Sequence, residues 1–155
     1  MRKSKKSPSS PKRRASPKRR ADLRILGSGE AFSSGLGNCS YLLSGPFLPT
    51  LLIDCGYQIP ERLWALPGAG GALDGIYFTH LHADHCFGLV PLVTRFQEEG
   101  RTRALQIFGP RGCEHFFKTL LNLGYPGVFR GLNYRLKFTE LEAGNSFRWR
   151  GLQIS

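Results

Sequence analysis

Four side chains that can bind a metal ion lie close together in the segment 79–85, Thr-His-Leu-His-Ala-Asp-His. They are His80, His82, Asp84 and His85. Imidazole nitrogens and carboxylate oxygens are ligands that zinc binds in hydrolytic sites. A purely structural interpretation would require three polar rings and a carboxylate to find hydrogen-bond partners in one short loop by coincidence. We therefore favour a metal site.

An apolar run over residues 75–79 precedes these ligands and predicts a buried strand. Where the chain leaves the end of that strand, His80 and His82 can turn to the same side and bind one cation. Asp84 and His85 lie further along and can face a second cation. The spacing therefore predicts a centre for two metal ions at the end of a strand.

For other candidate residues, the sequence gives weaker evidence of a functional role. Asp54 follows another predicted strand, and two roles stay open for it: it can hold the imidazole of a metal ligand in place, or it can cap its own turn. Cys86 is next to the ligands, but a buried structural cysteine is the commoner outcome. His115 lies among Phe and Leu in a predicted helix, and we expect it at the helix surface or partly packed. The Gly27-Ser28-Gly29 segment predicts a tight turn, since it lacks the third glycine of a phosphate-binding loop.

The elements around these residues alternate between strands and helices, which predicts an α/β fold with helices packed on a sheet. The predicted strands cover residues 23–26, 40–43, 51–53, 75–79, 104–108, 132–141 and 147–154. The second and third of these strands are expected to form a hairpin. The predicted helices cover residues 60–66, 87–99 and 111–123. Residues 68–71, which are rich in glycine, are expected to form a flexible loop.

The motif His80-x-His82-x-Asp84-His85, between an apolar strand and a helix, resembles the signature of the metallo-β-lactamase superfamily. Further stretches resemble the ribonuclease Z branch, whose members cut tRNA precursors at the 3′ side. These stretches are residues 26–32, 52–56, 79–89 and 108–112. The resemblance covers about residues 23–155. It implies an αβ/βα sandwich, of which this chain supplies the N-terminal half.

The resemblance also implies ligands that this sequence lacks. Family members complete the site with a further His, a bridging Asp and a final His, whereas only His115 follows His85 here. We therefore expect the chain, which stops at Ser155, to be truncated, with residues 22–155 forming a partial metallo-β-lactamase-like domain. Half of a sandwich is expected to leave one apolar sheet face exposed, which would promote self-association.

For a complete relative, the resemblance implies two zinc ions that lower the pKa of a bridging water, and a hydroxide that attacks a phosphodiester. His80 and His82 would bind the first ion and His85 the second. Asp84 would be the catalytic residue, because it binds one ion and orients the nucleophile. We thus predict a zinc-dependent hydrolase that resembles ribonuclease Z and has RNA as its substrate.

Two alternatives to this function stay open. The same fold also serves the hydrolysis of small esters, sulfates or cyclic nucleotides, because function resides in the site rather than in the fold. In the other alternative, the chain is a catalytically silent fragment whose basic tail binds nucleic acid.

The positive charge of the chain is concentrated at one end. Ten of the 22 Lys and Arg residues lie within residues 2–20, which contain no acidic residue, so the formal charge of +11 leaves only +1 on the rest of the chain. The hexapeptide Ser-Pro-Lys-Arg-Arg-Ala occurs twice in tandem, at 10–15 and 16–21. Residues 1–21 are expected to be a disordered tail that contacts nucleic acid or only aids solubility.

The cysteines and the apolar runs of the sequence indicate in which cellular compartment the protein works. Four well-separated cysteines without a Cys-x-x-Cys pair suit a reducing cytosol. No run approaches the length of about 18 to 20 apolar residues that spans a bilayer, and the basic tail lacks the apolar segment of an export signal. We therefore predict a cytoplasmic protein that does not enter a membrane.

Overall fold

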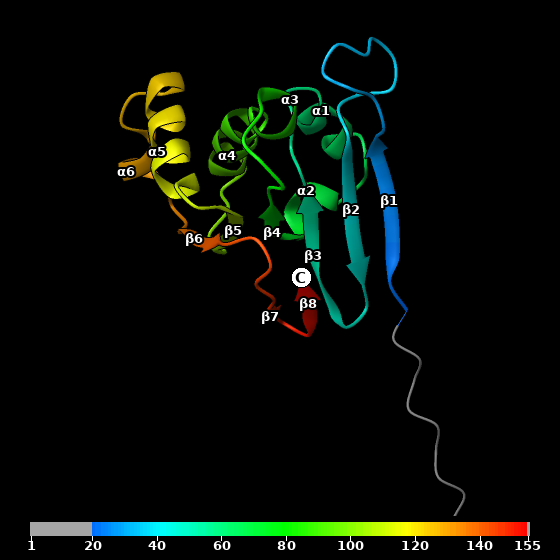
Figure 1. Ribbon diagram of the computed structural model, residues 1–155. Helices are drawn as coiled ribbons and strands as arrows, with labels where there is room; N and C mark the ends of the chain where they lie inside the picture. The colour runs from blue at the N-terminus through cyan, green and yellow to red at the C-terminus, as the bar shows by residue number, and fades with distance from the viewer. Residues whose placement is uncertain (1–19, 155) are drawn as a thin grey trace, which may run out of the picture.

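A six-stranded sheet forms the centre of the computed structural model, which describes residues 20–154 (Figure 1). Its strands, in spatial order, are β1 (Asp22–Gly27), β2 (Ser40–Gly45), β3 (Leu48–Ile53), β4 (Leu73–Tyr77), β5 (Leu105–Pro110) and β6 (Leu136–Leu141). The first three strands pair antiparallel, whereas β3, β4, β5 and β6 are mutually parallel. Parallel neighbours need crossover connections, and helical segments lie in each of these connections.

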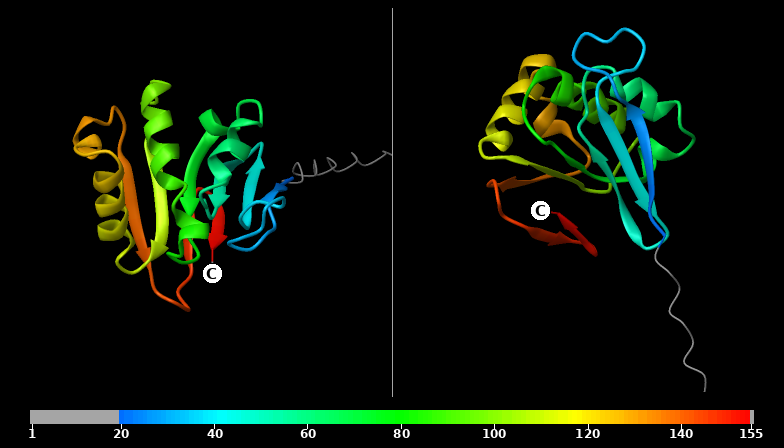
Figure 2. Two further views of the ribbon diagram at one scale, coloured as in Figure 1. Left: turned by 90° about the horizontal axis from the view of Figure 1, so that it is seen from above. Right: turned by 45° about the vertical axis from the view of Figure 1, so that its right-hand side comes forward.

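Helices cover one face of this sheet (Figure 2). They are α1 (Ile59–Trp64), α2 (Ala69–Ala72), α3 (Ala83–Cys86), α4 (Leu89–Glu98), α5 (Cys113–Gly124) and α6 (Val128–Gly131). Apolar side chains of the central strands, such as Leu52, Ile76 and Ile107, share one buried cluster with Phe96 of α4 and Phe117 of α5. The predicted α/β fold is confirmed, and its core lies between the sheet and the helices.

A short hairpin of β7 (Phe147–Trp149) and β8 (Leu152–Ile154) lies against the opposite face (Figure 2). Its aromatic rings pack on Phe108, with centroids 4.7 Å away for Phe147 and 5.1 Å away for Trp149. A single strand over 147–154 was the wrong prediction, because Arg150 and Gly151 both adopt positive φ angles, 47° and 89°, and reverse the chain in a two-residue turn.

The hairpin covers only part of its face. Leu23 and Ile25 of β1 stand opposite Leu43 and Tyr41 of β2 on the side away from the helices. Their side chains are 61% and 62% exposed. An apolar area therefore remains open at the β1 edge, and the self-association predicted for this face stays a prediction.

Other helix and strand boundaries differ from those that the sequence predicts. Residues 68–71 do not form a flexible loop: Gly68, at a φ of 72°, begins the short helix α2, and Gly70 packs against the ring of Trp64. The helix expected from residue 87 begins at Leu89, behind the separate turn α3. The strand expected from residue 132 begins only at Leu136, after α6.

The parallel pair β3 and β4 determines where the metal-binding motif lies. Both strands end at the same edge of the sheet, where the Asp54 backbone N–H donates to the Tyr77 carbonyl at 2.8 Å. The segments that follow β3 and β4 therefore meet. The disorder predicted for the tail concerns residues 1–19, which lie outside the described part of the chain. Within the described residues, no helix has the length and apolar character needed to cross a bilayer.

Candidate metal centre

Three imidazole rings gather beyond the end of β4. The ring centroid of His80 lies 4.0 Å from that of His85 and 4.6 Å from that of His82. His82 is the residue directly before α3, and Asp84 and His85 lie within that helix. The fold thus brings together all four residues of the predicted ligand set.

Asp54 lies directly beneath this cluster and is almost fully buried, with 4% of its surface exposed. One carboxylate oxygen, Oδ1, accepts a hydrogen bond from the Thr79 backbone N–H at 2.8 Å. The other, Oδ2, accepts from the Thr79 hydroxyl at 2.7 Å and lies 2.8 Å from His85 Nδ1. These bonds reach across to the neighbouring strand end rather than into the turn that Asp54 itself occupies.

The backbone at Asp54 adopts an unusual conformation, with a φ of 58°. Left-handed backbone is costly for residues other than glycine, although Asp and Asn tolerate it best. Three hydrogen bonds from Thr79 and His85 to the carboxylate offset that cost. A strained backbone beside a polar cluster is typical of functional sites.

Glycines allow the backbone after β3 to approach α3 closely. A Cβ atom added at Gly56 would lie 1.9 Å from the Asp84 carbonyl oxygen, and one at Gly88 would lie 2.2 Å from the Gly56 carbonyl oxygen. Backbone bonds join the same segments: Cys55 N–H donates to the His85 carbonyl at 2.7 Å. The position of the two ligands in α3 is therefore fixed by the backbone as well as by Asp54.

The donor set suits zinc. His85 Nε2 and Asp84 Oδ2 are 3.4 Å apart. Two ligands of one tetrahedral zinc ion, each about 2.0–2.2 Å from it, lie roughly 3.3–3.6 Å apart. Across residues 20–154, no three such side chains are close enough to surround an ion by themselves.

Burial lowers the pKa of His80 below its ordinary value, and the neighbouring imidazoles of His85 and His82 lower it further. A lowered pKa keeps the ring neutral at pH 7, and the neutral ring is the form that binds metal.

The weaker sequence signals can now be placed. Cys86 is fully buried, burial raises the pKa of its thiol to about 12, and the thiol donates to the Leu81 carbonyl at 3.4 Å, as a structural cysteine does. His115 lies on the exposed side of α5. The tight turn predicted for Gly27-Ser28-Gly29 is wrong: Gly27 ends β1, Gly29 forms a bridge with Asn38, and the chain reverses only in the residues between them. Sequence analysis did not single out Thr79 or Gly56, although both lie within the stretches that carry the resemblance.

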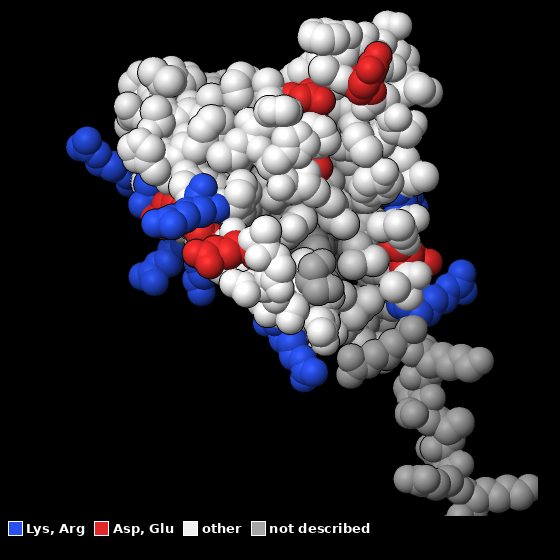
Figure 3. Space-filling model, in the orientation of Figure 1, with Lys and Arg blue, Asp and Glu red and all other residues white. Residues whose placement is uncertain are grey.

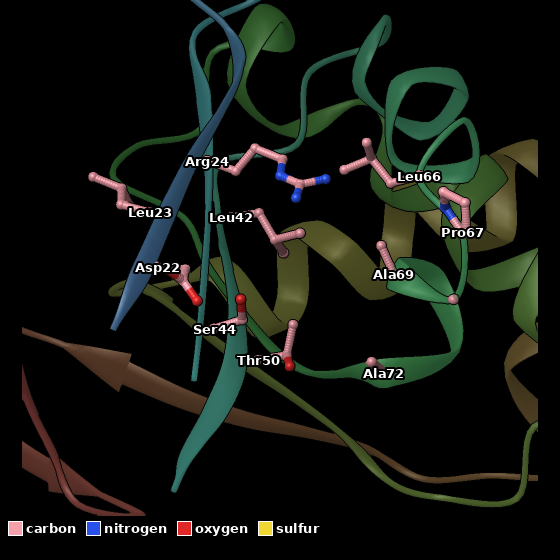
Figure 4. A pocket seen from close by; sticks show the side chains of 11 residues that line it. Asp22, Leu23, Arg24, Leu42, Ser44, Thr50, Leu66, Pro67, Ala69 and Ala72 are labelled. Carbon is pink, nitrogen blue, oxygen red and sulfur yellow. The ribbon is translucent and has the colours of Figure 1, made fainter. Parts of the chain in front are cut away.

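A pocket of about 530 Å³ elsewhere on the molecule is separate from this cluster. It lies between the beginnings of β1 and β3 and the α2 segment, where Arg24, Thr50 and Ala69 line it (Figure 4). No histidine lines it. It therefore contributes nothing to the metal centre.

Comparison with known proteins agrees with this geometry. A family model described as anti-Pycsar protein Apyc1 matches residues 21–155. The chain belongs to the Apyc1 family. This family assignment covers the whole described fold, including β7 and β8.

Curated relatives of this Apyc1 family member carry ribonuclease names. Ribonuclease BN of Erwinia tasmaniensis is 33% identical over 129 residues, which are 81% of this chain and 41% of that protein. Ribonuclease Z of Exiguobacterium sibiricum is 34% identical over 131 residues, which are 84% of this chain and 42% of that protein. The chain thus spans about two fifths of the length of these relatives.

Solved structures show the same relationship for this Apyc1 family member. Human tRNase Z, short form, superposes with a TM-score of 0.65 at 27% identity, over 76% of this chain and 44% of that chain. The metallo-β-lactamase fold protein YhfI of Bacillus subtilis superposes with a TM-score of 0.61 at 20% identity, over 83% of this chain and 48% of that chain, which shows the shared fold. The predicted place in the ribonuclease Z-like branch of the metallo-β-lactamase superfamily is confirmed.

Proposed function

We propose that the complete protein is a zinc-dependent phosphodiesterase, and that this chain supplies His80, His82, Asp84 and His85 to its two-metal centre. The observation that carries the proposal is a cluster of three imidazoles in which His85 contacts both the buried Asp54 and the Asp84 carboxylate. In this proposal Asp54 holds His85 in place, and its role as a turn cap is set aside because its bonds reach the neighbouring strand end.

Each residue contributes a separate part of the chemistry. When bound, zinc supplies Lewis-acid polarisation of the phosphoryl group and lowers the pKa of water toward neutrality. The rings of His80 and His82 are neighbours in the cluster and would bind one ion, and His85 presents Nε2 beside the Asp84 carboxylate. Asp84 is the catalytic residue of the proposal, because its free oxygen can accept a hydrogen bond from the attacking water and orient it.

RNA is the first proposed substrate. The relatives named ribonuclease Z and ribonuclease BN support it. The basic residues 2–20 would add phosphate contacts, and their number supports a role in holding RNA.

A second substrate class, small phosphodiesters such as cyclic nucleotides, is favoured by the charge around the cluster. Residues 28–38, 54–61 and 78–94 contain no Lys or Arg, and the guanidinium group of the next residue, Arg62, donates to the Leu26 and Gly35 carbonyls. On the face shown in Figure 3, the basic side chains lie away from α3 and the loop above it. A long RNA needs phosphate contacts that this part of the surface does not provide, whereas a small substrate needs few of them.

A reducing cytosol remains the proposed compartment. All four cysteines, at positions 39, 55, 86 and 113, are described and are free thiols. Free thiols are typical of proteins that work in the cytosol.

The function is tested by zinc content and by hydrolysis of bis(p-nitrophenyl) phosphate. We expect the complete protein to retain zinc and to turn over this diester, and His82→Ala to lose at least about 100-fold in turnover. His115→Ala is the matched control, since it removes an exposed imidazole on α5 and is expected to change neither zinc content nor turnover. Absence of both zinc and turnover in the complete protein would contradict the proposal, and their absence in the 155-residue chain alone would establish the silent-fragment alternative.

A second experiment distinguishes RNA from small phosphodiesters as the substrate class. If RNA is the substrate, removal of residues 1–21 is expected to weaken RNA binding and to reduce its dependence on salt. Efficient turnover of a cyclic nucleotide, with tRNA precursors left uncut, would instead support the small-substrate class.

A further inference from the structure

The hydroxyl of Thr79 lies between Asp54 and His80. Its Oγ1 is 2.7 Å from Asp54 Oδ2 and 2.9 Å from His80 Nδ1. The same Asp54 oxygen is 2.8 Å from His85 Nδ1. One carboxylate oxygen is therefore linked to two imidazoles, to His85 directly and to His80 through the hydroxyl.

The direction of each hydrogen bond follows from the chemistry of Asp54. An ionised carboxylate only accepts, so the Thr79 hydroxyl donates its single proton to Oδ2. The hydroxyl oxygen is then left as an acceptor for His80, and the ring nitrogen that faces it, Nδ1, must carry the proton. By the same reasoning His85 donates from Nδ1 to Asp54.

Both rings are thus held as the Nδ1–H tautomer, which leaves the Nε2 lone pair free. The other tautomer would place a proton on Nε2 of His80 and block that nitrogen as a metal ligand. His80 has no carboxylate of its own among its hydrogen-bond partners in the described chain, whereas His85 does. The tautomer of His80 therefore depends on a single hydroxyl.

We propose that Thr79 is a positioning residue that transmits the influence of Asp54 to His80 and sets its metal-binding tautomer. This proposal rests on the proposed function only in its consequence for zinc. The tautomer itself is a property of the metal-free chain.

The structure allows the hydroxyl to be removed with little other change. Thr79→Val has the same shape and keeps the backbone N–H that donates to Asp54 Oδ1 at 2.8 Å. Thr79 is exposed, so the methyl group that replaces the hydroxyl does not enter the packed core. Thr79→Ser restores the hydroxyl. Thr94→Val is the matched control, because the Thr94 hydroxyl bonds only to carbonyl groups within its own helix α4, those of Val90 and Pro91.

The experiment records the ¹⁵N spectra of the histidine rings in the metal-free protein at pH 8. We expect His80 and His85 to show the Nδ1–H tautomer in the unmodified protein, in Thr79→Ser and in Thr94→Val. In Thr79→Val, His80 is expected to shift toward the Nε2–H tautomer while His85 stays unchanged. Competition with a zinc chelator is expected to show zinc affinity reduced about 10-fold to 100-fold in Thr79→Val and largely restored in Thr79→Ser.

An unchanged His80 tautomer in Thr79→Val overturns the proposal. So does an equal loss of zinc affinity in Thr79→Ser, because that result would assign the effect to the shape of the side chain. If the unmodified protein binds no zinc while the tautomers respond as described, the proposed function fails and the role of Thr79 stands.

Discussion

The parallel pair β3 and β4 carries an aspartate at each of its two ends, and the two aspartates have different partners. At the end where the strands finish, Asp54 accepts from Thr79 and contacts an imidazole. At the end where they begin, Asp74 accepts from the Thr50 backbone N–H at 2.9 Å and pairs with Arg150 at 2.7 Å.

The difference between the ends lies in burial and in the charge of the partners. Asp54 is almost fully buried beside imidazole rings, whereas Asp74 meets the permanently charged guanidinium groups of Arg103 and Arg150, both more than half exposed. Guanidinium groups neutralise a carboxylate and leave no ligand for a metal ion. Imidazoles held by a carboxylate keep a free nitrogen. Under the proposed function, the same backbone arrangement thus places a carboxylate that pairs with guanidinium groups at one end and a carboxylate that orients a metal ligand at the other.

Among the substitutions that test the difference between Asp54 and Asp74, Asp54→Asn is expected to have the largest effect. The amide keeps one acceptor, but its NH₂ group must face either the Thr79 N–H or the hydroxyl and His85 Nδ1–H. Zinc affinity is expected to fall about 10-fold to 100-fold, and a buried unpaired donor is expected to cost about 1–3 kcal/mol of unfolding free energy. Chelator competition and urea unfolding measure the two effects. Unchanged zinc affinity would remove the distinction between the two aspartates.

Alkaline pH is expected to have a smaller effect, a loss of folding stability that arises from the buried thiols beside Asp54. Burial and then the Asp54 charge raise the pKa of Cys55 and of Cys86 above the ordinary value of a thiol, that of Cys86 to about 12. Above pH 9 the unfolded chain loses these protons while the folded chain keeps them, so stability is constant below about pH 9 and falls as the pH rises further. We expect the Tm to drop between pH 8 and pH 10.5, less steeply in Cys86→Ala. A flat Tm over this range would contradict the account of these thiols.

The smallest effect is expected from Asp74→Asn. Exposed ion pairs contribute about 0–1 kcal/mol, and the amide oxygen still accepts from Thr50. We expect a loss of at most about 1 kcal/mol that shrinks further in high salt, with zinc content unchanged. A change in zinc affinity as large as that of Asp54→Asn would show that the two ends do not have separate roles.

Much of the site was predictable because its residues are contiguous. His80, His82, Asp84 and His85 lie in one short segment after a recognisable strand, so their types and spacing alone indicated metal chemistry. Asp54 was identified as a residue near the site, but its role stayed open, because the register of β3 against β4 decides which strand end its carboxylate reaches.

The parts that sequence analysis missed depend on contacts between distant segments. The need for Gly56 arises only from the Asp84 carbonyl that approaches it, and the role proposed for Thr79 arises only from the position of Asp54. Helix α2 forms in a segment that is rich in glycine and has low helix propensity, because Gly70 packs against Trp64. The turn at Arg150 requires a positive φ from a residue that gives no sign of it in the sequence.

X-ray absorption at the zinc edge tests the central claim most directly. The account predicts, for the zinc-loaded protein, only nitrogen and oxygen neighbours at about 2.0–2.2 Å, with the outer-shell scattering of imidazole rings that weakens in His82→Ala. A sulfur neighbour at about 2.3 Å, or a spectrum that His82→Ala leaves unchanged, would contradict it.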